Sequence, residues 1–323
     1  MEQDSSKVLN FKHISSATKE AVEYIESRKN HIVESLKTGS PKFDSVCMGG
    51  IEPNCIYTIT GISGSGKSSF VNKLETNLID LNPNQEVIVL DFSFEMLSSR
   101  QVSRKLSSKL RRTTSELFSV NETLSDEELD KVKREADSLY KYPIYYVDTP
   151  GSVEDIEKTI YAFYNKLVLG TNKKFIIILD HLLLIEGDTS GDTTLKTISD
   201  LQKVFIKVKK LPNTTIIQLS QMNRNIEKPE RINNPSAHYP MRSDISSADT
   251  IYHASDYVIC IHRPELLQIS SYGINHLPTN NKVFLHIMKN RDAGTCGIIV
   301  YENDLKYNNL IETEVEQKQV INT

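Results

Sequence analysis

The segment from Gly61 to Ser68 is the feature that most constrains what this chain can fold into. It reads Gly-Ile-Ser-Gly-Ser-Gly-Lys-Ser and matches the pattern G-x-x-x-x-G-K-[ST] in full. A β-rich run at residues 56–60 precedes it, and a helical pattern at residues 67–81 follows it. Glycines let a backbone wrap around an anion, and the N–H groups of a helix N-terminus point at that anion. We therefore predict a phosphate-binding loop (P-loop), and the strand–loop–helix context argues against a chance Gly/Ser loop.

Each residue of this loop has an expected role toward a nucleoside triphosphate. Lys67 is expected to reach the β- and γ-phosphates, and the hydroxyl of Ser68 to bind Mg²⁺. The predicted cofactors are therefore ATP and Mg²⁺. The other residues expected to contact the phosphates are Gly61, Ser63, Gly64, Ser65, Gly66 and Ser69.

A second acidic position supports the same site. Residues 175–179 form an apolar run that ends in Asp180, which places one carboxylate at the carboxyl end of a buried strand. Open α/β sheets bind their ligands at that edge. Asp180 is therefore expected to hold the magnesium ion together with Ser68. The alternative is an aspartate that only caps the next turn.

Two further strand ends carry candidate catalytic groups. Glu95 follows the apolar strand at residues 87–92, where a carboxylate can orient or deprotonate the water that attacks the γ-phosphate. Gln221 follows the strand at residues 215–219, where its amide can touch the γ-phosphate and pass that contact to the loop behind it. The alternative for Gln221 is an ordinary glutamine at the end of a strand.

Apolar strands alternate with helical patterns along the chain, which predicts an α/β fold with a mostly parallel sheet covered on both faces. Ser125 and Glu128 form a capping-box pattern that predicts a helix to about residue 139. Apolar residues between positions 21 and 36 recur at helical spacing, which predicts one or two N-terminal helices. The stretch 223–250 is long and irregular, which is typical of a functional or disordered loop.

Composition limits the partners of the protein. Its 38 basic and 42 acidic residues give a net charge of 38 − 42 = −4, so any nucleic-acid contact must come from a local patch.

The four cysteines contain no C-x-x-C pair, which disfavours a zinc site. The N-terminus has no signal-peptide layout, and the apolar runs are too short to span a bilayer. We therefore expect a protein of the reducing cytoplasm (the host cytoplasm for a phage protein) with no membrane partner.

Several blocks together resemble the motor domain of DnaB-type replicative DNA helicases, in the order of that family and over about residues 15–305. They are Phe94-Glu95-Met96 with Arg104 nine residues past the glutamate, Tyr146-Val147-Asp148-Thr149-Pro150-Gly151, Leu219-Ser220-Gln221-Met222-Asn223-Arg224 and Lys289-Asn290-Arg291-Asp292-Ala293-Gly294-Thr295. The resemblance implies a RecA-like P-loop NTPase with a mostly parallel central sheet, flanked by helices and preceded by a helical linker. It further implies a Mg-ATP-dependent, ring-forming helicase or translocase on single-stranded DNA that acts in DNA replication.

The same resemblance implies further site residues and partners. Arg104 joins the nucleotide-binding residues, and Lys289 and Arg291 reach into the site of a neighbouring subunit, as an arginine finger does. The alternative for this pair is a solvated basic turn. The assembly is expected to be a homo-oligomer, a hexamer, with a helicase loader or primase as possible partners. The N-terminal helix either docks on the adjacent subunit or packs on its own domain.

The expected domains are a tail and linker helix (1–38), a RecA-like motor (39–310) and a flexible C-terminal tail (311–323). Only about 40 residues precede the motor, so we expect the helical N-terminal domain of the family, and the primase-docking role tied to it, to be missing. The fourth motif also departs from the family, because Ser246 stands where the family has arginine. The candidate nucleic-acid contacts are Arg224, Lys228, Arg231, Arg242 and Ser246, and acidic residues of the same stretch offset their charge.

Two other functions fit parts of the same pattern. A RecA-like recombination or repair ATPase would use open contacts between subunits to form filaments, whereas closed contacts give rings. A degenerate member of the family would act as an ATP-regulated scaffold for a partner protein. The altered fourth motif around Ser246 would be its signature.

Overall fold

The computed structural model describes residues 10–189 and 191–313. They fall into two compact units, Met1–Ser35 and Leu36–Thr323. In the first unit, helix α1 (Ile14–Lys29) begins after His13, whose ring nitrogen accepts the N–H of Ser15. The helix ends at Lys29 and a turn follows, so the N-terminal helical segment is shorter than the apolar spacing predicts.

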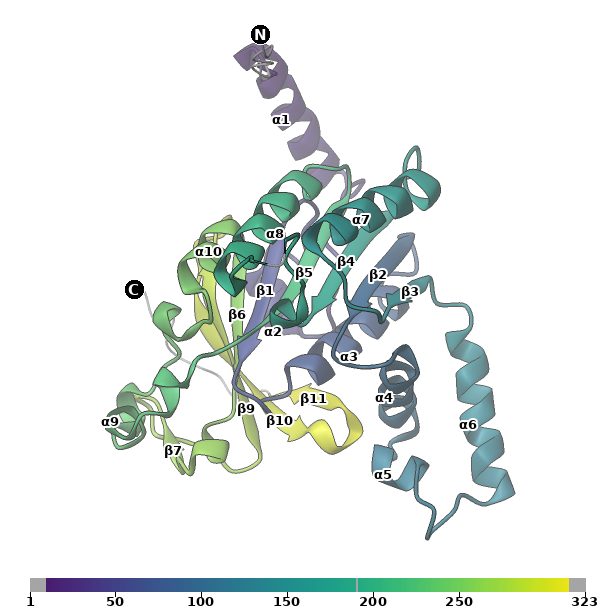
Figure 1. Cartoon of the computed structure of the whole chain (residues 1–323), viewed down its shortest axis with the longest axis vertical. Helices are drawn as coiled ribbons and strands as arrows, with labels where there is room; N and C mark the ends of the chain where they lie inside the picture. The colour runs from purple at the N-terminus through teal and green to yellow at the C-terminus, as the bar shows by residue number, and fades with distance from the viewer. Residues whose placement is uncertain (1–9, 190, 314–323) are drawn as a thin grey trace. The chain divides into compact units, whose positions relative to one another are not determined.

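The second unit is built on one large sheet (Figure 1). Within the described residues, nine strands lie in the order β11-β10-β9-β6-β1-β5-β4-β2-β3. The run from β6 to β3 is parallel, and β9, β10 and β11 extend it as an antiparallel edge. The strands are β1 (Ile56–Gly61), β2 (Val87–Ser93), β3 (Ile144–Val147), β4 (Lys174–Asp180), β5 (Thr214–Gln221), β6 (Tyr257–His262), β9 (Lys282–Asn290), β10 (Gly297–Asp304) and β11 (Asn309–Glu312), with a separate pair β7 (Ser271–Tyr272) and β8 (Leu277–Pro278). The predicted mostly parallel sheet is confirmed.

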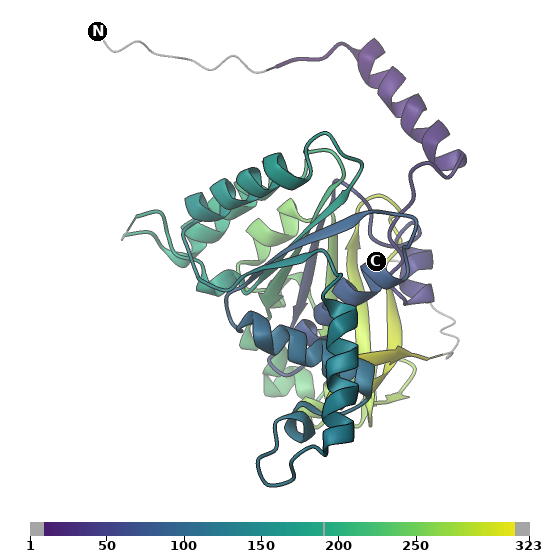
Figure 2. The ribbon, with the colours of Figure 1, turned by 90° about the vertical axis from the view of Figure 1, so that its right-hand side faces the viewer.

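Helices cover both faces of the sheet because its strands are apolar on both sides. Tyr57 and Ile59 of β1 pack with α2 and α3 on one face, and Ile56 packs with α7, α8 and α10 on the other. Figures 1 and 2 show α7 and α8 lying along one side of the strands. The helices of this unit are α2 (Pro41–Val46), α3 (Lys67–Asp80), α4 (Ser98–Leu110), α5 (Thr114–Leu117), α6 (Asp126–Leu139), α7 (Val153–Leu167), α8 (Thr194–Val208), α9 (Pro229–Ile232) and α10 (Ala248–Ala254).

The helix α6 confirms a local prediction. Ser125 accepts the N–H of Glu128 through its hydroxyl, and the Glu128 carboxylate accepts the N–H of Ser125, so the predicted capping box is formed. None of the helices in the described part of the chain is both long and apolar enough to span a bilayer.

The long segment 223–250 is ordered by short helices and by one buried ion pair. It contains η2 (Arg224–Glu227), α9, η3 (Pro235–Ala237) and η4 (Arg242–Asp244). Arg231 pairs with the fully buried Asp244 at 2.5 Å and donates to the carbonyl oxygen of Tyr239 at 2.6 Å. The segment is therefore built around an internal salt bridge.

The C-terminal boundary of the motor lies later than the expected residue 310. Strand β11 continues to Glu312, which pairs with Tyr301 of β10. The Glu312 carboxylate also accepts hydrogen bonds from the hydroxyl of Ser40 and the N–H of Lys42. These contacts tie residues 311 and 312 to the sheet, and they correct the prediction that the flexible tail begins at residue 311. The rest of that tail from residue 314 on, like residues 1–9, lies outside the described residues.

Candidate nucleotide site

The P-loop connects β1 to α3 and requires glycine at two positions. A Cβ on Gly61 would lie 2.4 Å from the carbonyl oxygen of Ile261 and 2.5 Å from the Ser65 hydroxyl oxygen. Gly66 is the N-cap of α3 with φ = 104°, and a Cβ there would lie 2.8 Å from the Leu305 side chain. Larger residues are therefore excluded at both positions by backbone conformation and by close approach.

Lys67, the first residue of α3, folds back over its own loop. Its Nζ donates to the carbonyl oxygens of Gly61 and Ile62, each at 3.0 Å. Burial lowers the pKa of Lys67, and the nearby carboxylates of Asp180 and Glu95 oppose that shift. The ammonium therefore lies where a phosphate held by the loop can pair with it.

Ser68 and Asp180 meet across two elements that are far apart in the sequence. The Ser68 hydroxyl, on α3, donates to Asp180 Oδ2, at the end of β4, at 2.9 Å. Burial raises the pKa of Asp180, the hydrogen bond from Ser68 lowers it, and Glu95 raises it further. A hydroxyl and a carboxylate are the oxygen ligands that Mg²⁺ prefers, and a divalent cation would offset the buried negative charge. The pair therefore fits a magnesium ion held between the P-loop and β4.

Glu95 and Arg104 add a carboxylate and a guanidinium to this site. The N–H of Phe94 donates to the carbonyl oxygen of Asp180 at 2.8 Å, so the segment after β2 lies beside the end of β4. Glu95 is exposed there. Burial lowers the pKa of Arg104, on α4, whereas Asp180 and Glu95 raise it. The structure therefore brings the predicted residues from β2, α3, α4 and β4 within electrostatic reach of one another.

Gln221 ends β5 level with the start of the P-loop. In the parallel pairing of β1 with β5, Gly61 lies opposite Gln221, and the N–H of Met222 donates to the carbonyl oxygen of Gly61 at 3.2 Å. On its other side, the carbonyl oxygen of Gln221 accepts the N–H of Ser246 at 2.9 Å. Gln221 therefore connects the P-loop to the segment that holds the fourth motif.

Contacts that the sequence analysis did not predict support the P-loop from the residues that follow β6 and precede β11. Arg263, directly after β6, donates through Nη1 to the carbonyl oxygen of Gly64 at 3.1 Å and pairs with Glu265 at 2.6 Å. Ser69 donates to Asn308 at 3.2 Å. The sequence signal for Arg263 was only that a charged residue follows a strand. The parallel pairing of β6 with β1 places the end of that strand beside the P-loop.

Lys289 and Arg291 lie at the opposite end of the sheet from the P-loop. Strand β9 runs antiparallel to β6, which places Asn290 opposite Tyr257 at the amino end of β6. The P-loop follows the carboxyl end of β1, and a strand of this length spans about 16 Å. Within one chain, this pair therefore does not lie at the nucleotide site.

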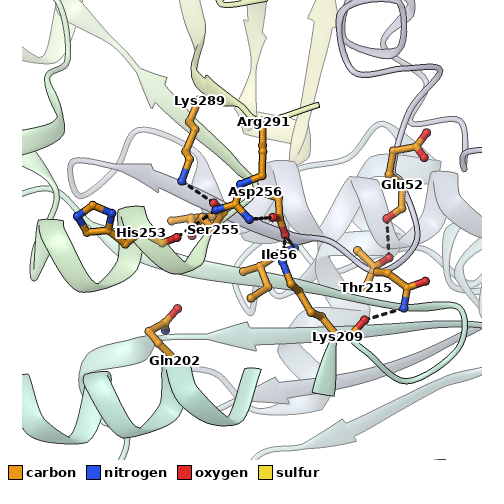
Figure 3. A network of polar contacts seen from close by, with 12 residues as sticks. Glu52, Ile56, Gln202, Lys209, Thr215, His253, Ser255, Asp256, Lys289 and Arg291 are labelled. Atoms are coloured by element: carbon orange, nitrogen blue, oxygen red, sulfur yellow. Dashed lines mark hydrogen bonds and ion pairs between the residues drawn. The ribbon is translucent and has the colours of Figure 1, made fainter. Parts of the chain in front are cut away.

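Both side chains are held at the junction of α10 and β6 (Figure 3). Lys289 donates to the carbonyl oxygens of Tyr252 and Ser255 at 2.6 and 2.7 Å. Arg291 pairs with Asp256 at 2.6 Å, and its side chain is 47% exposed. The predicted basic pair is therefore ordered by contacts within the subunit.

The candidate nucleic-acid residues divide into two kinds. Arg224 and Lys228 are exposed, and Ser246 is half-buried. Arg242 forms a surface pair with Asp249, and such pairs contribute little and are readily replaced. The prediction that Arg231 contacts nucleic acid is wrong, because its side chain is only 17% exposed and its guanidinium is paired with the buried carboxylate of Asp244. We assign Arg231 to holding the segment together.

Fold and site together define a RecA-like P-loop domain with a nucleotide site at the carboxyl edge of its parallel strands. The model of the DnaB-like helicase C-terminal domain family matches residues 35–309, and the chain belongs to that family. This confirms the resemblance drawn from the motifs.

Relatives and solved structures agree with this membership. The replicative DNA helicase DnaB of Rickettsia typhi is 26% identical over 245 residues, which is 74% of this chain and 47% of the relative. The chain thus spans about half the length of the curated relatives it matches. One solved ATPase domain superposes with a TM-score of 0.77 at 21% identity, covering 94% of this chain and all of that one. A DnaB-like replicative helicase, solved in a study of its interactions with primase, gives a TM-score of 0.74 at 20% identity, covering 94% and 68% of the two chains.

Proposed function

We propose that this chain is the motor of a Mg-ATP-dependent DNA helicase that translocates on single-stranded DNA during replication. The observation that carries the proposal is the position of Gln221. Its strand pairs it with Gly61 at the start of the P-loop, and its carbonyl oxygen accepts the N–H of Ser246 in the fourth motif. A contact between Gln221 and the γ-phosphate would therefore be passed to the segment proposed to hold DNA.

The residues around the P-loop suit ATP hydrolysis. Lys67 and the loop N–H groups would hold the phosphates, and Ser68 and Asp180 would hold Mg²⁺, which offsets charge on the phosphate oxygens. Glu95 would orient a water for attack on the γ-phosphorus and take its proton, with ADP leaving and inorganic phosphate forming. Arg104 would offset the negative charge of the same site from α4.

The location of Lys289 and Arg291 supports a ring. Both lie about one strand length from their own P-loop, so they act on a γ-phosphate only if another subunit presents it. A head-to-tail contact repeated around a closed ring supplies that geometry. We propose a homo-oligomer, a hexamer, in which the segment up to residue 35 links subunits and residues 36–312 form the motor. A helicase loader or primase is the proposed further partner, in the cytoplasm.

The DNA contact would use the exposed Arg224 and Lys228 together with backbone N–H groups near Ser246. Single-strand affinity rests mainly on neutralised phosphates, so it should fall steeply with salt. A net charge of −4 leaves little non-specific affinity from the rest of the surface.

A binding titration with a fluorescent single-stranded oligonucleotide, with and without a non-hydrolysable ATP analogue, tests the proposal. We expect tighter binding with the analogue, ATP turnover stimulated by the oligonucleotide, and loss of both effects in Lys67→Ala. ATP turnover that ignores DNA, with no single-strand binding at low salt, would contradict the helicase proposal and favour the scaffold alternative.

A further inference from the structure

Asp256 is the centre of a buried polar network at the amino end of the sheet (Figure 3). Its side chain is 5% exposed and accepts from three donors. Oδ2 accepts the N–H of Ile56 at 2.8 Å and Nζ of Lys209 at 2.6 Å. Oδ1 accepts Nη1 of Arg291 at 2.6 Å. The carboxylate therefore joins the start of β1, the end of α8 and the segment after β9.

The two oxygens of this carboxylate are used differently. Oδ2 is occupied by a backbone N–H of a central strand and by Lys209, whose side chain is 17% exposed, so its position is fixed by rigid groups. Oδ1 accepts from Arg291 alone among the hydrogen bonds of the described residues. The backbone reinforces this contact, because the N–H of Arg291 donates to the carbonyl oxygen of Asp256 at 3.1 Å. A fixed carboxylate thus holds one edge of the guanidinium.

The rest of the guanidinium remains accessible. Its Nη2 makes only a longer bond, 3.3 Å, to the carbonyl oxygen of His253, and the Arg291 side chain is 47% exposed. Arginine has five N–H donors in a planar fork, so a guanidinium held at one edge still offers donors to an anion. This is the geometry of an oriented cation with a free face.

The local charge favours an anionic ligand. Lys209 and Arg291 bring two positive charges to the single carboxylate of Asp256. Lys289 adds a third cation close by, and its pKa is lowered by burial and by Arg291, while Asp256 opposes the shift. Even with the adjacent Asp292 counted beside Asp256, three cations meet two carboxylates, so the cluster keeps positive charge.

We propose that Asp256 is the positioning residue of Arg291, holding the guanidinium ready for the γ-phosphate of ATP bound by a second copy of this chain. The inference rests on the proposed function and deepens it, because it names the group that orients the finger. Asp256 itself does not touch the nucleotide. It acts through Arg291, as a buried carboxylate orients the catalytic group that it supports.

Steady-state ATPase assays of the assembled protein test this role through Asp256→Asn, which keeps the shape and removes the charge. We expect kcat to fall about 10- to 100-fold with KM for ATP unchanged, by analogy with the cost of removing a carboxylate that supports a metal-binding histidine. In the Arg291→Ala background, Asp256→Asn should cost nothing further. A purely structural role would lower kcat in both backgrounds. The control is Glu128→Gln on α6, which removes the carboxylate that pairs with Arg112. This variant also breaks an arginine–carboxylate pair, and it should keep wild-type turnover.

Mixing experiments test whether Asp256 acts together with Arg291 or together with the P-loop. Asp256→Asn subunits keep their P-loop and Lys67→Ala subunits keep their finger, so mixtures of the two should regain turnover. Mixtures of Asp256→Asn with Arg291→Ala should not, because both lack a working finger. Recovery in that second mixture, or wild-type or faster turnover of Asp256→Asn alone, would overturn the inference.

Two further measurements keep the test decisive. Wild-type turnover of Arg291→Ala would remove the finger from the proposed function itself, whatever Asp256→Asn does. If circular dichroism shows that Asp256→Asn is unfolded, Asp256→Glu takes its place. That variant keeps the charge but shifts it by one methylene, and it should show a smaller loss of kcat and the same mixing pattern. Wild-type kcat, or recovery with Arg291→Ala, would overturn the inference for this variant too.

Discussion

The N–H of Ser246 donates a 2.9 Å hydrogen bond to the carbonyl oxygen of Gln221, at the point where β5 ends. Two neighbouring contacts strengthen this junction, a β-bridge between Met222 and Ile245 and a 2.6 Å bond from the N–H of Asn223 to the carbonyl oxygen of Asp244. Because Gln221 is also level with Gly61, the P-loop and the fourth motif are separated by a single residue. A shift of that residue would therefore reach both segments through backbone contacts.

Gln221→Ala should uncouple ATP turnover from DNA. The variant keeps the backbone contacts and all P-loop groups, so nucleotide affinity should stay within about threefold, a change worth less than 1 kcal/mol. Stimulation of turnover by single-stranded DNA should disappear, because the amide proposed to contact the γ-phosphate is gone. ATPase assays with increasing oligonucleotide check this, with Gln85→Ala, before β2 at the opposite end of the sheet, as the control. Full stimulation in Gln221→Ala would mean that another group carries the signal.

Glu95→Gln should bind ATP and fail to hydrolyse it. The amide keeps the size of the side chain but does not accept a proton, and losing a general base typically costs about 10²- to 10⁴-fold. Fluorescent-nucleotide binding and phosphate release measure the two steps separately. Glu154→Gln, on the exposed side of α7, is the matched control. Wild-type phosphate release by Glu95→Gln would place the catalytic carboxylate elsewhere.

Arg291→Ala and Lys67→Ala should each be nearly inactive alone and should complement each other when mixed. Losing an arginine finger typically costs about 10³-fold or more in turnover. In a mixed assembly, an intact Arg291 from one variant can face an intact P-loop from the other, so part of the activity should return. Native mass spectrometry verifies that mixed oligomers form. If they form and no activity returns, Arg291 acts within its own subunit or not at all.

Removal of residues 1–35 should leave a folded motor that no longer assembles stably. The cut must stop before Leu36, which is buried and forms a bridge with Ile51 in the second unit. Helix α1 buries none of its residues, and its apolar Val22 and Ile25 are exposed. Light scattering should show monomers or small oligomers, with an unchanged circular dichroism spectrum. A truncated protein that keeps the full oligomer would show that α1 is not needed for assembly.

Acidification below pH 6.5 should destabilise the protein through three buried histidines. His238 stacks on His262 with ring centroids 5.3 Å apart, and His286 lies 6.2 Å from His262. Burial lowers the pKa of each, that of His262 well below its usual value and that of His286 to about 3. The unfolded chain, with ordinary pKa values near 6.5, then binds more protons than the native state. The contribution of these neutral histidines to stability is therefore fully present above pH 6.5. It is lost progressively as the pH falls toward their pKa values in the folded protein.

Urea denaturation at pH 7.5 and 5.5 measures this effect. Each fully depressed histidine should remove at most about 1.4 kcal/mol per pH unit below 6.5. His262→Gln should reduce the pH dependence, whereas the exposed His276→Gln should leave it unchanged. Equal pH dependence in the wild type and His262→Gln would contradict the prediction.

Local features of this protein follow from the sequence alone. The glycines and Lys67 specify a loop between a strand and a helix, because φ restrictions and helix N-termini are properties of neighbouring residues. Asp180 directly follows a continuous apolar run, and Glu95 lies just past a second mostly apolar run, so both are expected at the carboxyl edge of a parallel sheet, where the structure places them. The capping box at Ser125 and Glu128 is likewise set by residues three apart.

Tertiary structure alone decided which of these groups meet. Arg231 and Arg242 look alike in the sequence, yet one is consumed by the buried Asp244 and the other lies on the surface. Asp256 looks like an ordinary strand-start aspartate until β9 returns antiparallel and brings Arg291 to it. The physical reason is that a local pattern determines the conformation and the buried face of an element. Strand order and charge partners depend on long-range packing between elements, which periodicity along the chain does not encode.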